Sequence, residues 1–176
     1  FHYSNIVEDN VFLFIARLIE DKGIIEFLTA AQIIKKKFPN VIFRVIGEID
    51  YENPSKINKN YLDYQRKLNY FQYNSFTDKI IDEIKNSSCV VLPSYREGKS
   101  RVLLEAMAIG RPIIASDVPG CKDLINYGKN GFITSARNPI DLENKMIKMI
   151  DLSLEEKNMM GIEGRKIIEE NYDVEI

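Results

Sequence analysis

The chain has 176 residues, of which 45% are hydrophobic and 28% charged, and its formal net charge is −2. This length favours one domain with a substantial core. A net charge so close to zero provides no field that would attract nucleic acid or anionic lipid, so no nucleic-acid partner is predicted. No apolar run is long enough to cross a bilayer, so no membrane span is predicted.

The sequence contains few residues that could form a disulfide or bind a metal ion through cysteine or histidine. The two cysteines, Cys89 and Cys121, do not form a disulfide framework, and the single histidine is His2. We therefore predict no metal site, and Cys89 is interpreted as a small buried apolar residue. The first residues lack the features of a signal peptide, which predicts a cytoplasmic location. Because the chain does not begin with Met, we expect it to be a piece of a longer protein.

Hydrophobic periodicity and turn residues predict strands alternating with helices. The predicted strands lie at residues 11–16, 41–46, 70–73, 89–92, 112–115 and 132–134. The predicted helices lie at residues 24–38, 61–68, 78–86 (capped by Thr77 and Asp78), 101–109 and 122–127, from Pro139 onward with Asn138 as the N-cap, and at 154–171. The last helix is predicted to bury Met159, Ile162, Ile167 and Ile168.

This alternation predicts an α/β fold, a Rossmann-like parallel sheet with helices on both faces. Ligands bind such sheets at the carboxyl ends of the strands. Functional side chains are therefore expected on the loops that follow the strands, at residues 17–23, 47–50, 73–78, 93–100 and 116–120.

The loop after the first strand carries two cations, Arg17 and Lys22. An arginine presents a rigid fork to phosphate oxygens and a lysine presents a mobile point charge. Held at the end of a central strand, the two could neutralise one diphosphate. The alternative is a solvated loop in which Arg17 pairs with Asp21.

The loop before the helix at residues 101–109 carries Glu97, and Glu105 lies one turn into that helix. A helix N-terminus offers unpaired backbone N–H groups to an anion such as phosphate, and Gly98 allows close approach of a ligand. A carboxylate at Glu105 could accept both hydroxyls of a ribose. The alternatives are an ion pair of Glu97 with Arg96 or Arg101, and stabilisation of the helix dipole by Glu105.

Two spaced motifs, Arg17-x4-Lys22-Gly23 and Pro93-Ser94-x2-Glu97-Gly98-x6-Glu105-Ala106, resemble those of the retaining glycosyltransferases of family 4, which have the GT-B architecture. The resemblance is to bacterial members that build capsule, lipopolysaccharide and exopolysaccharide. It implies that residues 1–176 are the C-terminal, donor-binding domain, and that an N-terminal acceptor domain is absent from this chain. The usual second glycine of the loop after the second strand is missing from residues 47–50.

The resemblance also implies roles for individual residues. Arg17 and Lys22 would bind the diphosphate of the donor without a metal ion or other cofactor. Glu105 would bind the ribose, and Glu97 would lie beside the reacting carbon of the sugar. The backbone of Gly98, Lys99, Ser100 and Arg101 would contact sugar hydroxyls and phosphate, and Ser75 and Phe76 would contact the base. The residues given a catalytic role are Glu97, Arg17 and Lys22.

The activity implied is transfer of a hexose from a nucleoside diphosphate sugar to an acceptor hydroxyl. The acceptor would be a saccharide or a lipid-linked saccharide held by the missing domain, in the cytoplasm or at the inner face of the membrane. The isolated chain is expected to bind the donor without efficient transfer. Two alternatives are a non-catalytic nucleotide-binding or regulatory module, and a GT-B-type nucleotide-sugar epimerase. The Ser-Gly-x3-Glu motif expected for the epimerase is absent from the sequence.

Overall fold

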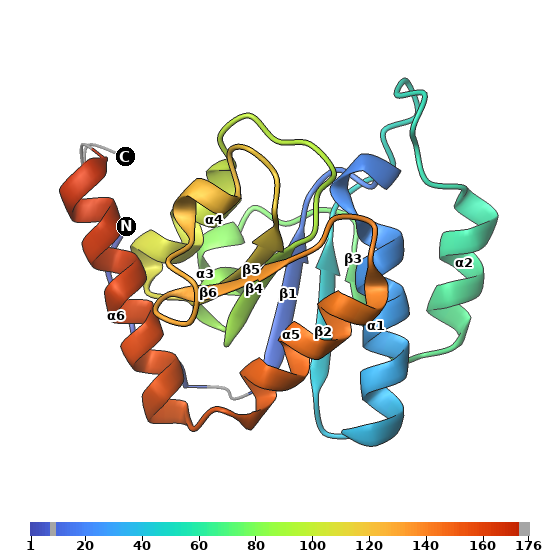
Figure 1. The fold of residues 1–176 in the computed structure, drawn as a ribbon. Coiled ribbons are helices and arrows are strands. Elements are labelled where there is room, and N and C mark those ends of the chain that lie inside the picture. The colour runs from blue at the N-terminus through green and yellow to red at the C-terminus, as the bar shows by residue number, and fades with distance from the viewer. Residues whose placement is uncertain (8–9, 173–176) are drawn as a thin grey trace.

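A computed structural model describes residues 1–7 and 10–172, in which six parallel strands form one sheet with the order β3-β2-β1-β4-β5-β6 (Figure 1). The strands are β1 (Val11–Ile15), β2 (Ile42–Ile46), β3 (Gln72–Asn74), β4 (Cys89–Leu92), β5 (Ile113–Ser116) and β6 (Gly131–Thr134). The helices are α1 (Ile24–Lys37), α2 (Lys59–Lys67), α3 (Ile80–Lys85), α4 (Arg101–Ile109), α5 (Pro139–Asp151) and α6 (Leu154–Asn171), with 3-10 turns η1 (Glu20–Lys22) and η2 (Lys122–Leu124).

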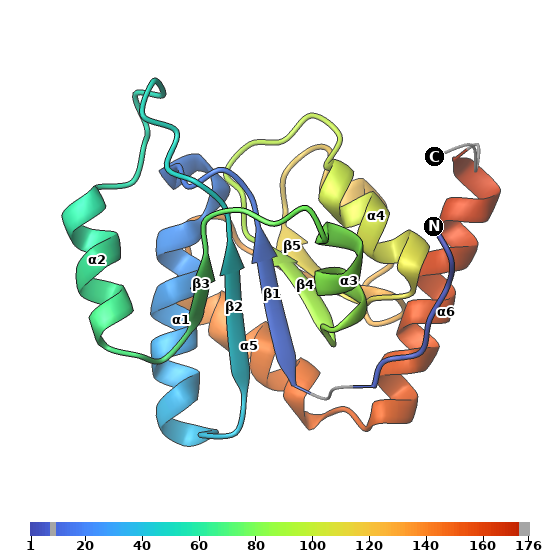
Figure 2. The same ribbon diagram turned by 180° about the vertical axis from the view of Figure 1, so that it is seen from behind.

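Helices cover both faces of the sheet. α1 and α5 lie in front of the strands in Figure 1, whereas α3 and α4 lie in front of them in Figure 2, with α6 packed beside α4. The short helix α2 stands outside the edge strand β3. This arrangement confirms the predicted Rossmann-like α/β fold. Within the described residues, no helix is both long and apolar enough to be a candidate membrane span.

The central strands are buried on both sides, which explains their uninterrupted apolar sequences. Phe12 and Phe14 of β1 have no exposed surface. Phe12 stacks on Phe43 of β2 with ring centroids 5.8 Å apart, and Phe14 packs against Phe27 of α1 at 5.3 Å. Aromatic packing thus fixes α1 against the first two strands, directly below the loop that follows β1.

Several predicted boundaries differ from the structure. The strand predicted at residues 70–73 is β3, at Gln72–Asn74, and two predicted helices are shorter than expected. The Oγ1 atom of Thr77 accepts a hydrogen bond from the backbone N–H of Lys79 at 3.0 Å, which closes a turn before the helix, so α3 begins at Ile80 with Lys79 as its N-cap. The predicted helix at residues 122–127 is only the single turn η2. By contrast, Asn138 caps α5 as predicted, because its Oδ1 atom accepts from the N–H of Asp141.

The inward face of α6 was predicted in part: Ile168 is buried and Ile167 packs against the core, as predicted, but Met159 and Ile162 were placed wrongly. Met159 and Ile162 are 59% and 40% exposed, and the buried residues of this helix include Met160 and Gly161. The cause is the close approach of the helix backbone to the end of α4. A Cβ atom at Gly161 would lie 2.1 Å from the carbonyl oxygen of Gly110. A glycine face, invisible to a pattern of large apolar residues, therefore sets the rotation of α6.

Substitution of Gly161 by Ala should lower the free energy of unfolding by about 1–3 kcal/mol, because the added methyl group meets backbone that cannot move aside easily. The matched control is Gly164→Ala on the same helix. There the nearest atom to the new methyl group is Met107 Cγ at 3.5 Å, an ordinary contact, so the gain in helix propensity of up to about 1 kcal/mol should dominate. Urea unfolding followed by circular dichroism measures both. Equal effects of the two substitutions would contradict this account of α6.

Candidate functional site

The loops after β1 and β4 meet at the centre of the sheet, where the strand order reverses direction. Gly23 adopts the left-handed conformation with φ of 72° between η1 and α1. A Cβ atom on Gly23 would lie 2.1 Å from the carbonyl oxygen of Pro93, so only glycine lets the two loops lie against each other. The backbone N–H of Tyr95 donates to the carbonyl oxygen of Asp21 at 2.8 Å. Backbone contacts alone therefore hold the two loops together.

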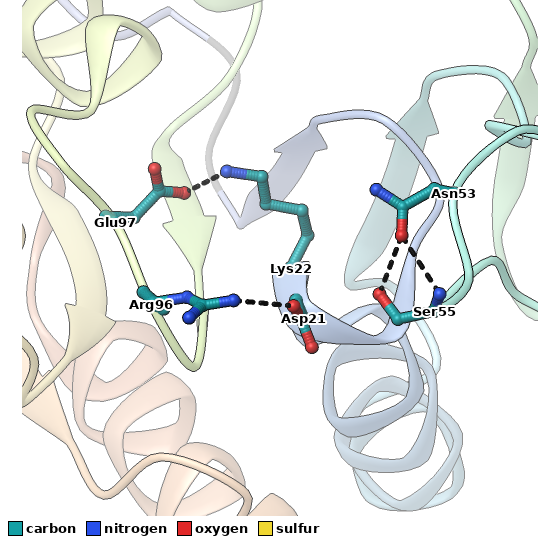
Figure 3. Close-up of polar contacts among 6 residues, drawn as sticks. All are labelled: Asp21, Lys22, Asn53, Ser55, Arg96 and Glu97. Atoms are coloured by element: carbon teal, nitrogen blue, oxygen red, sulfur yellow. Dashed lines mark hydrogen bonds and ion pairs between the residues drawn. The ribbon is translucent and has the colours of Figure 1, made fainter.

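This junction brings Lys22 and Glu97 together, 75 residues apart in the sequence. Figure 3 shows the two side chains pointing toward one another, and Lys22 Nζ donates to Glu97 Oε1 at 2.5 Å. The Oγ atom of Ser94 donates to the same oxygen at 2.9 Å. The Lys22 and Glu97 side chains are only 20% and 10% exposed, so the pair is screened little by solvent. Glu97 therefore pairs with Lys22 and not with the arginines considered as alternatives.

A second ion pair lies beside the first. Arg96 Nη2 lies 3.8 Å from Asp21 Oδ2 (Figure 3). Arg96 directly precedes Glu97 and Asp21 directly precedes Lys22, so the two ion pairs join the same two loops. The hydroxyl of Tyr95 donates to Glu26 Oε1 at 2.7 Å, at the start of α1. Burial, then the hydrogen bond to Glu26, raises the pKa of Tyr95, so it remains a hydrogen-bond donor at neutral pH. Tyr95 was not selected from the sequence, and Ser94 was named only as part of the motif, without a role, although both lie inside the predicted loop at residues 93–100.

Arg17 is placed differently from Lys22. Its Nη1 atom lies 2.6 Å from Asp50 Oδ2, in the loop after β2, and its side chain is 64% exposed. The alternative pairing of Arg17 with Asp21 is not what the structure shows. Asp50 was missed as a partner, although it ends the predicted loop at residues 47–50. Arg17 and Lys22 thus extend from one loop toward the two neighbouring loops, after β2 and after β4.

The loop between β2 and α2 is itself well anchored. Asn53 Oδ1 accepts from the backbone N–H of Ser55 at 2.9 Å, and Figure 3 shows this turn beside η1. The carbonyl oxygen of Ser55 accepts from the N–H of Glu20 at 2.7 Å. A Cβ atom on Gly47 would lie 1.8 Å from the carbonyl oxygen of Ala16, so this loop also touches the end of β1 directly. The partner of Arg17 is therefore carried on ordered backbone.

Helix α4 begins next to Glu97 and carries the second predicted carboxylate. Ser100 is the N-cap residue, and no side-chain hydrogen bond from it caps the helix, so first-turn N–H groups are left for another acceptor. Arg101 Nε donates to Glu105 Oε1 at 2.9 Å, one turn apart. Both residues line an open cavity of about 790 Å³, whose opposite wall includes Ile80 and Ile81 of α3. Arg101 and Glu105 therefore share a ligand-sized space.

Gly98 and Lys99 lie in the loop between Glu97 and the start of α4. The space where a Cβ atom on Gly98 would lie is open, while Gly120 backs the loop so closely that its own Cβ atom would lie 1.4 Å from the Gly98 carbonyl oxygen. The ammonium of Lys99 lies 4.6 Å from the ring centre of Tyr172, at the end of α6. For Gly98 and Lys99 the prediction concerns their backbone groups, which would contact sugar hydroxyls and phosphate. Both residues are exposed, so a ligand could reach them.

Ser75 and Phe76 follow the edge strand β3. Both are exposed, and Ser75 lines a separate cavity of about 350 Å³ whose walls include Tyr51 and Tyr73. The next residue, Thr77, lines the cavity beside α4. The two residues predicted to contact the base thus lie between two cavities. Like Lys22, they follow the carboxyl end of a strand. Their contact with a base remains a prediction.

The buried thiol of Cys121 lies close to the Lys22–Glu97 pair. Burial, reinforced by the nearby carboxylate of Glu97, raises the pKa of the Cys121 thiol to about 12, so it is protonated at neutral pH. Among the residues that the structure describes, no group of three or more His, Cys, Asp or Glu could hold a metal ion. The arrangement offers the Lys22–Glu97 pair and the nearby cation Arg17 on the loops after β1 and β4, the start of α4 without a side-chain cap, and Glu105 in the cavity beside that helix.

Comparison with known proteins gives consistent matches. A family model described as "Glycosyl transferases group 1" matches residues 3–167. The capsular polysaccharide biosynthesis glycosyltransferase CapM of Staphylococcus aureus is 32% identical over 176 residues, covering 99% of this chain and 45% of CapM. This chain therefore spans less than half the length of that relative.

Two solved structures share the fold. The structure of Anabaena Alr3699/HepE in complex with UDP superposes with a TM-score of 0.82 at 22% identity, covering 94% of this chain and 45% of HepE. The C-terminal domain of the glycosyl transferase group 1 family protein LpcC from Francisella tularensis superposes with a TM-score of 0.78 at 21% identity, covering 97% of this chain and 89% of that domain.

The Lys22–Glu97 pair should show strong coupling in a double-mutant cycle. Lys22→Met leaves a largely buried carboxylate without its counter-ion, and Glu97→Gln leaves the ammonium without one. The double substitution leaves neither charge unpaired, so it should cost less than the sum of the two single substitutions. We expect a coupling free energy of about 1–3 kcal/mol in urea unfolding. The exposed pair Arg101 and Glu105 is the control, with an expected coupling of about 0.3–0.5 kcal/mol. Equal coupling in both cycles would mean that the Lys22–Glu97 pair is not the cross-loop contact described above.

Proposed function

Because this chain belongs to the family of glycosyl transferases group 1, we propose that it is the donor-binding domain of a retaining glycosyltransferase of family 4, acting in the synthesis of a capsule, lipopolysaccharide or exopolysaccharide. The observation that carries the proposal is the Lys22–Glu97 pair. It places a cation and a carboxylate together at the reversal point of the strand order, beside the start of α4. A nucleoside diphosphate sugar needs this combination of charges at its phosphate and sugar ends.

The diphosphate would bind between Lys22, Arg17 and the first turn of α4. An ammonium group has three N–H donors, so Lys22 can keep its bond to Glu97 and still donate to a phosphate oxygen. Arg17 would exchange Asp50 for the phosphate. As the bond to the sugar breaks, negative charge builds on the leaving diphosphate, and fixed positive groups stabilise that charge without a metal ion. Glu97 would orient the sugar and stabilise positive charge at its anomeric carbon.

The nucleoside would occupy the cavity between α3 and α4. Glu105 offers carboxylate oxygens to the ribose hydroxyls, and its present partner Arg101 has an 85% exposed side chain that can move away. The apolar side chains of Ile80 and Ile81 provide a wall against which a base can lie. Ser75 and Phe76 would contact the base from the rim. UDP is the first nucleotide to test, because the Alr3699/HepE structure was solved in complex with it.

The acceptor would bind to a part of the enzyme outside this chain. Over 97% of its length this chain superposes on a domain crystallised by itself, the C-terminal domain of LpcC, which supports the interpretation of this chain as one domain. An N-terminal domain would hold the saccharide or lipid-linked saccharide acceptor, at the inner face of the membrane where the acceptor is lipid-linked. The isolated chain should then bind the donor without efficient transfer.

Titration calorimetry of this chain with UDP, GDP and their sugars is the direct test. We expect saturable binding of at least one nucleotide, unchanged by EDTA because no metal is required, and weakened by Lys22→Ala and by Arg17→Ala. Lys36→Ala, an exposed cation in the last turn of α1, is the control that should bind normally. Binding of no nucleotide would exclude the donor-binding role. Loss of binding in EDTA would refute the metal-independent site.

In a full-length enzyme that contains this domain, Lys22→Ala or Arg17→Ala should cost about 2–4 kcal/mol of transition-state stabilisation, as for other preorganised electrostatic groups. This corresponds to a fall in kcat/KM of roughly 30- to 1,000-fold. Steady-state assays of sugar transfer would measure it, with Lys36→Ala again as the control. Turnover by Lys22→Ala at the rate of the unsubstituted enzyme would refute the catalytic role. Rapid turnover by residues 1–176 alone would refute the need for a second domain.

A further inference from the structure

The first residues of the chain form an extended segment, residues 1–7, that we call the N-terminal strap. Figure 2 shows it running beside α6. The backbone N–H of Ser4 donates to the carbonyl oxygen of Ile109 at 3.0 Å, and that of Ile6 donates to Asn158 Oδ1 at 2.8 Å. Arg165 Nη1 donates to the carbonyl oxygen of Phe1 at 2.9 Å. The strap is therefore held along its length, against the end of α4 and against α6.

Arg111 lies where the strap, α3 and α4 come together. It follows the C-cap of α4, and its side chain has no exposed surface. Its guanidinium donates to oxygens of all three segments. The acceptors are Ile84 O and Lys85 O at the end of α3, Gly110 O at the end of α4, and Ser4 O, Ser4 Oγ and Asn5 O in the strap, at 2.7–3.2 Å.

The ends of two helices help to stabilise this buried charge. Carbonyl groups at a helix C-terminus carry partial negative charge, and α3 and α4 both direct such carbonyls at Arg111. Burial lowers the pKa of Arg111 to about 10, so the guanidinium is still charged at neutral pH. A planar guanidinium with donors on several sides can join three segments at once, which a lysine ammonium on a thin stem cannot do with the same geometry.

The three segments that Arg111 joins also line the cavity beside α4. Phe1 belongs to the strap, Ile80 and Ile81 to α3, and Val102 and Glu105 to α4. We propose that Arg111 is a positioning residue that couples the strap to the nucleotide cavity: seating of the strap fixes the spacing of α3 and α4, and a nucleotide between these helices tightens the strap. This inference rests on the proposed donor-binding function. Through Arg111, an acceptor domain that precedes Phe1 would affect the spacing of α3 and α4 at the cavity.

Thermodynamic reciprocity makes the coupling measurable from both sides. The test compares the unsubstituted chain with Arg111→Lys, which retains a charge but cannot span the three segments. UDP and GDP are titrated by calorimetry at a temperature where circular dichroism shows each variant to be folded. We expect Arg111→Lys to weaken nucleotide binding on the order of tenfold. In the unsubstituted chain, saturating nucleotide should slow amide hydrogen exchange at Ser4 and Ile6, and in Arg111→Lys this slowing should be lost.

Tyr70→Phe is the control for a general loss of stability. It removes a buried hydrogen bond, from Tyr70 to Gln65 Oε1 at 2.6 Å, that joins none of the three segments. This variant should bind nucleotide normally and retain the slowing of exchange. If Arg111→Lys does not fold, Ser4→Ala takes its place, because it removes only the Oγ acceptor of Arg111. It should give a smaller loss of nucleotide affinity and a smaller loss of the slowing of exchange.

The outcomes separate this inference from the proposed function. Nucleotide binding with no change of exchange in the strap, or with equal affinity in all the variants, would overturn the coupling and leave the donor-binding function intact. Binding of neither UDP nor GDP to the unsubstituted chain would overturn the nucleotide site itself, and the coupling with it. Equal weakening of binding by Tyr70→Phe and Arg111→Lys would reduce Arg111 to a stabilising residue.

Discussion

The close contact of Gly23 with the carbonyl group of Pro93 is the constraint on which the site depends. It allows the loops after β1 and β4 to lie against each other where the strand order reverses, a junction that a Cβ atom at Gly23 would push apart. The backbone bond from Tyr95 to Asp21 then fixes the relative position of the loops. Once the backbones are joined, Lys22 and Glu97 meet without further adjustment. The charged pair is thus a consequence of backbone packing.

Much of the fold could be predicted because burial leaves a simple trace in the sequence. β4 and α4 were predicted at their observed limits, since a continuous apolar run and a short amphipathic helix ended by Gly110 are strong signals. The errors occurred where packing depends on small or polar groups. The close packing of α6 at Gly161 leaves Met159 and Ile162 exposed, and the turn closed by Thr77 delays the start of α3.

The site was predictable as a set of residues on neighbouring loops, but its partners were not. Lys22 and Glu97 were placed at one edge of the sheet, yet nothing in the spacing distinguished Lys22 from Arg96 as the partner of Glu97. The bond of Arg17 to Asp50 depends on the close contact between the loops after β1 and β2. Nothing in the sequence distinguishes Arg111 from an ordinary charged residue after a helix. Only its burial reveals the contacts that it makes.

The two cations of the site differ in how readily they could accept a new partner. Breaking the exposed pair of Arg17 and Asp50 costs about 0–1 kcal/mol, so the proposed replacement of Asp50 by a phosphate would lose little. Lys22 is held in place by a largely buried carboxylate, which itself accepts a hydrogen bond from Ser94. Separating that pair would leave a buried charge unpaired, so a ligand should add to it and not disrupt it. One cation is therefore held in place and the other can change its partner at little cost, which is the division that the proposed binding and release of a diphosphate requires.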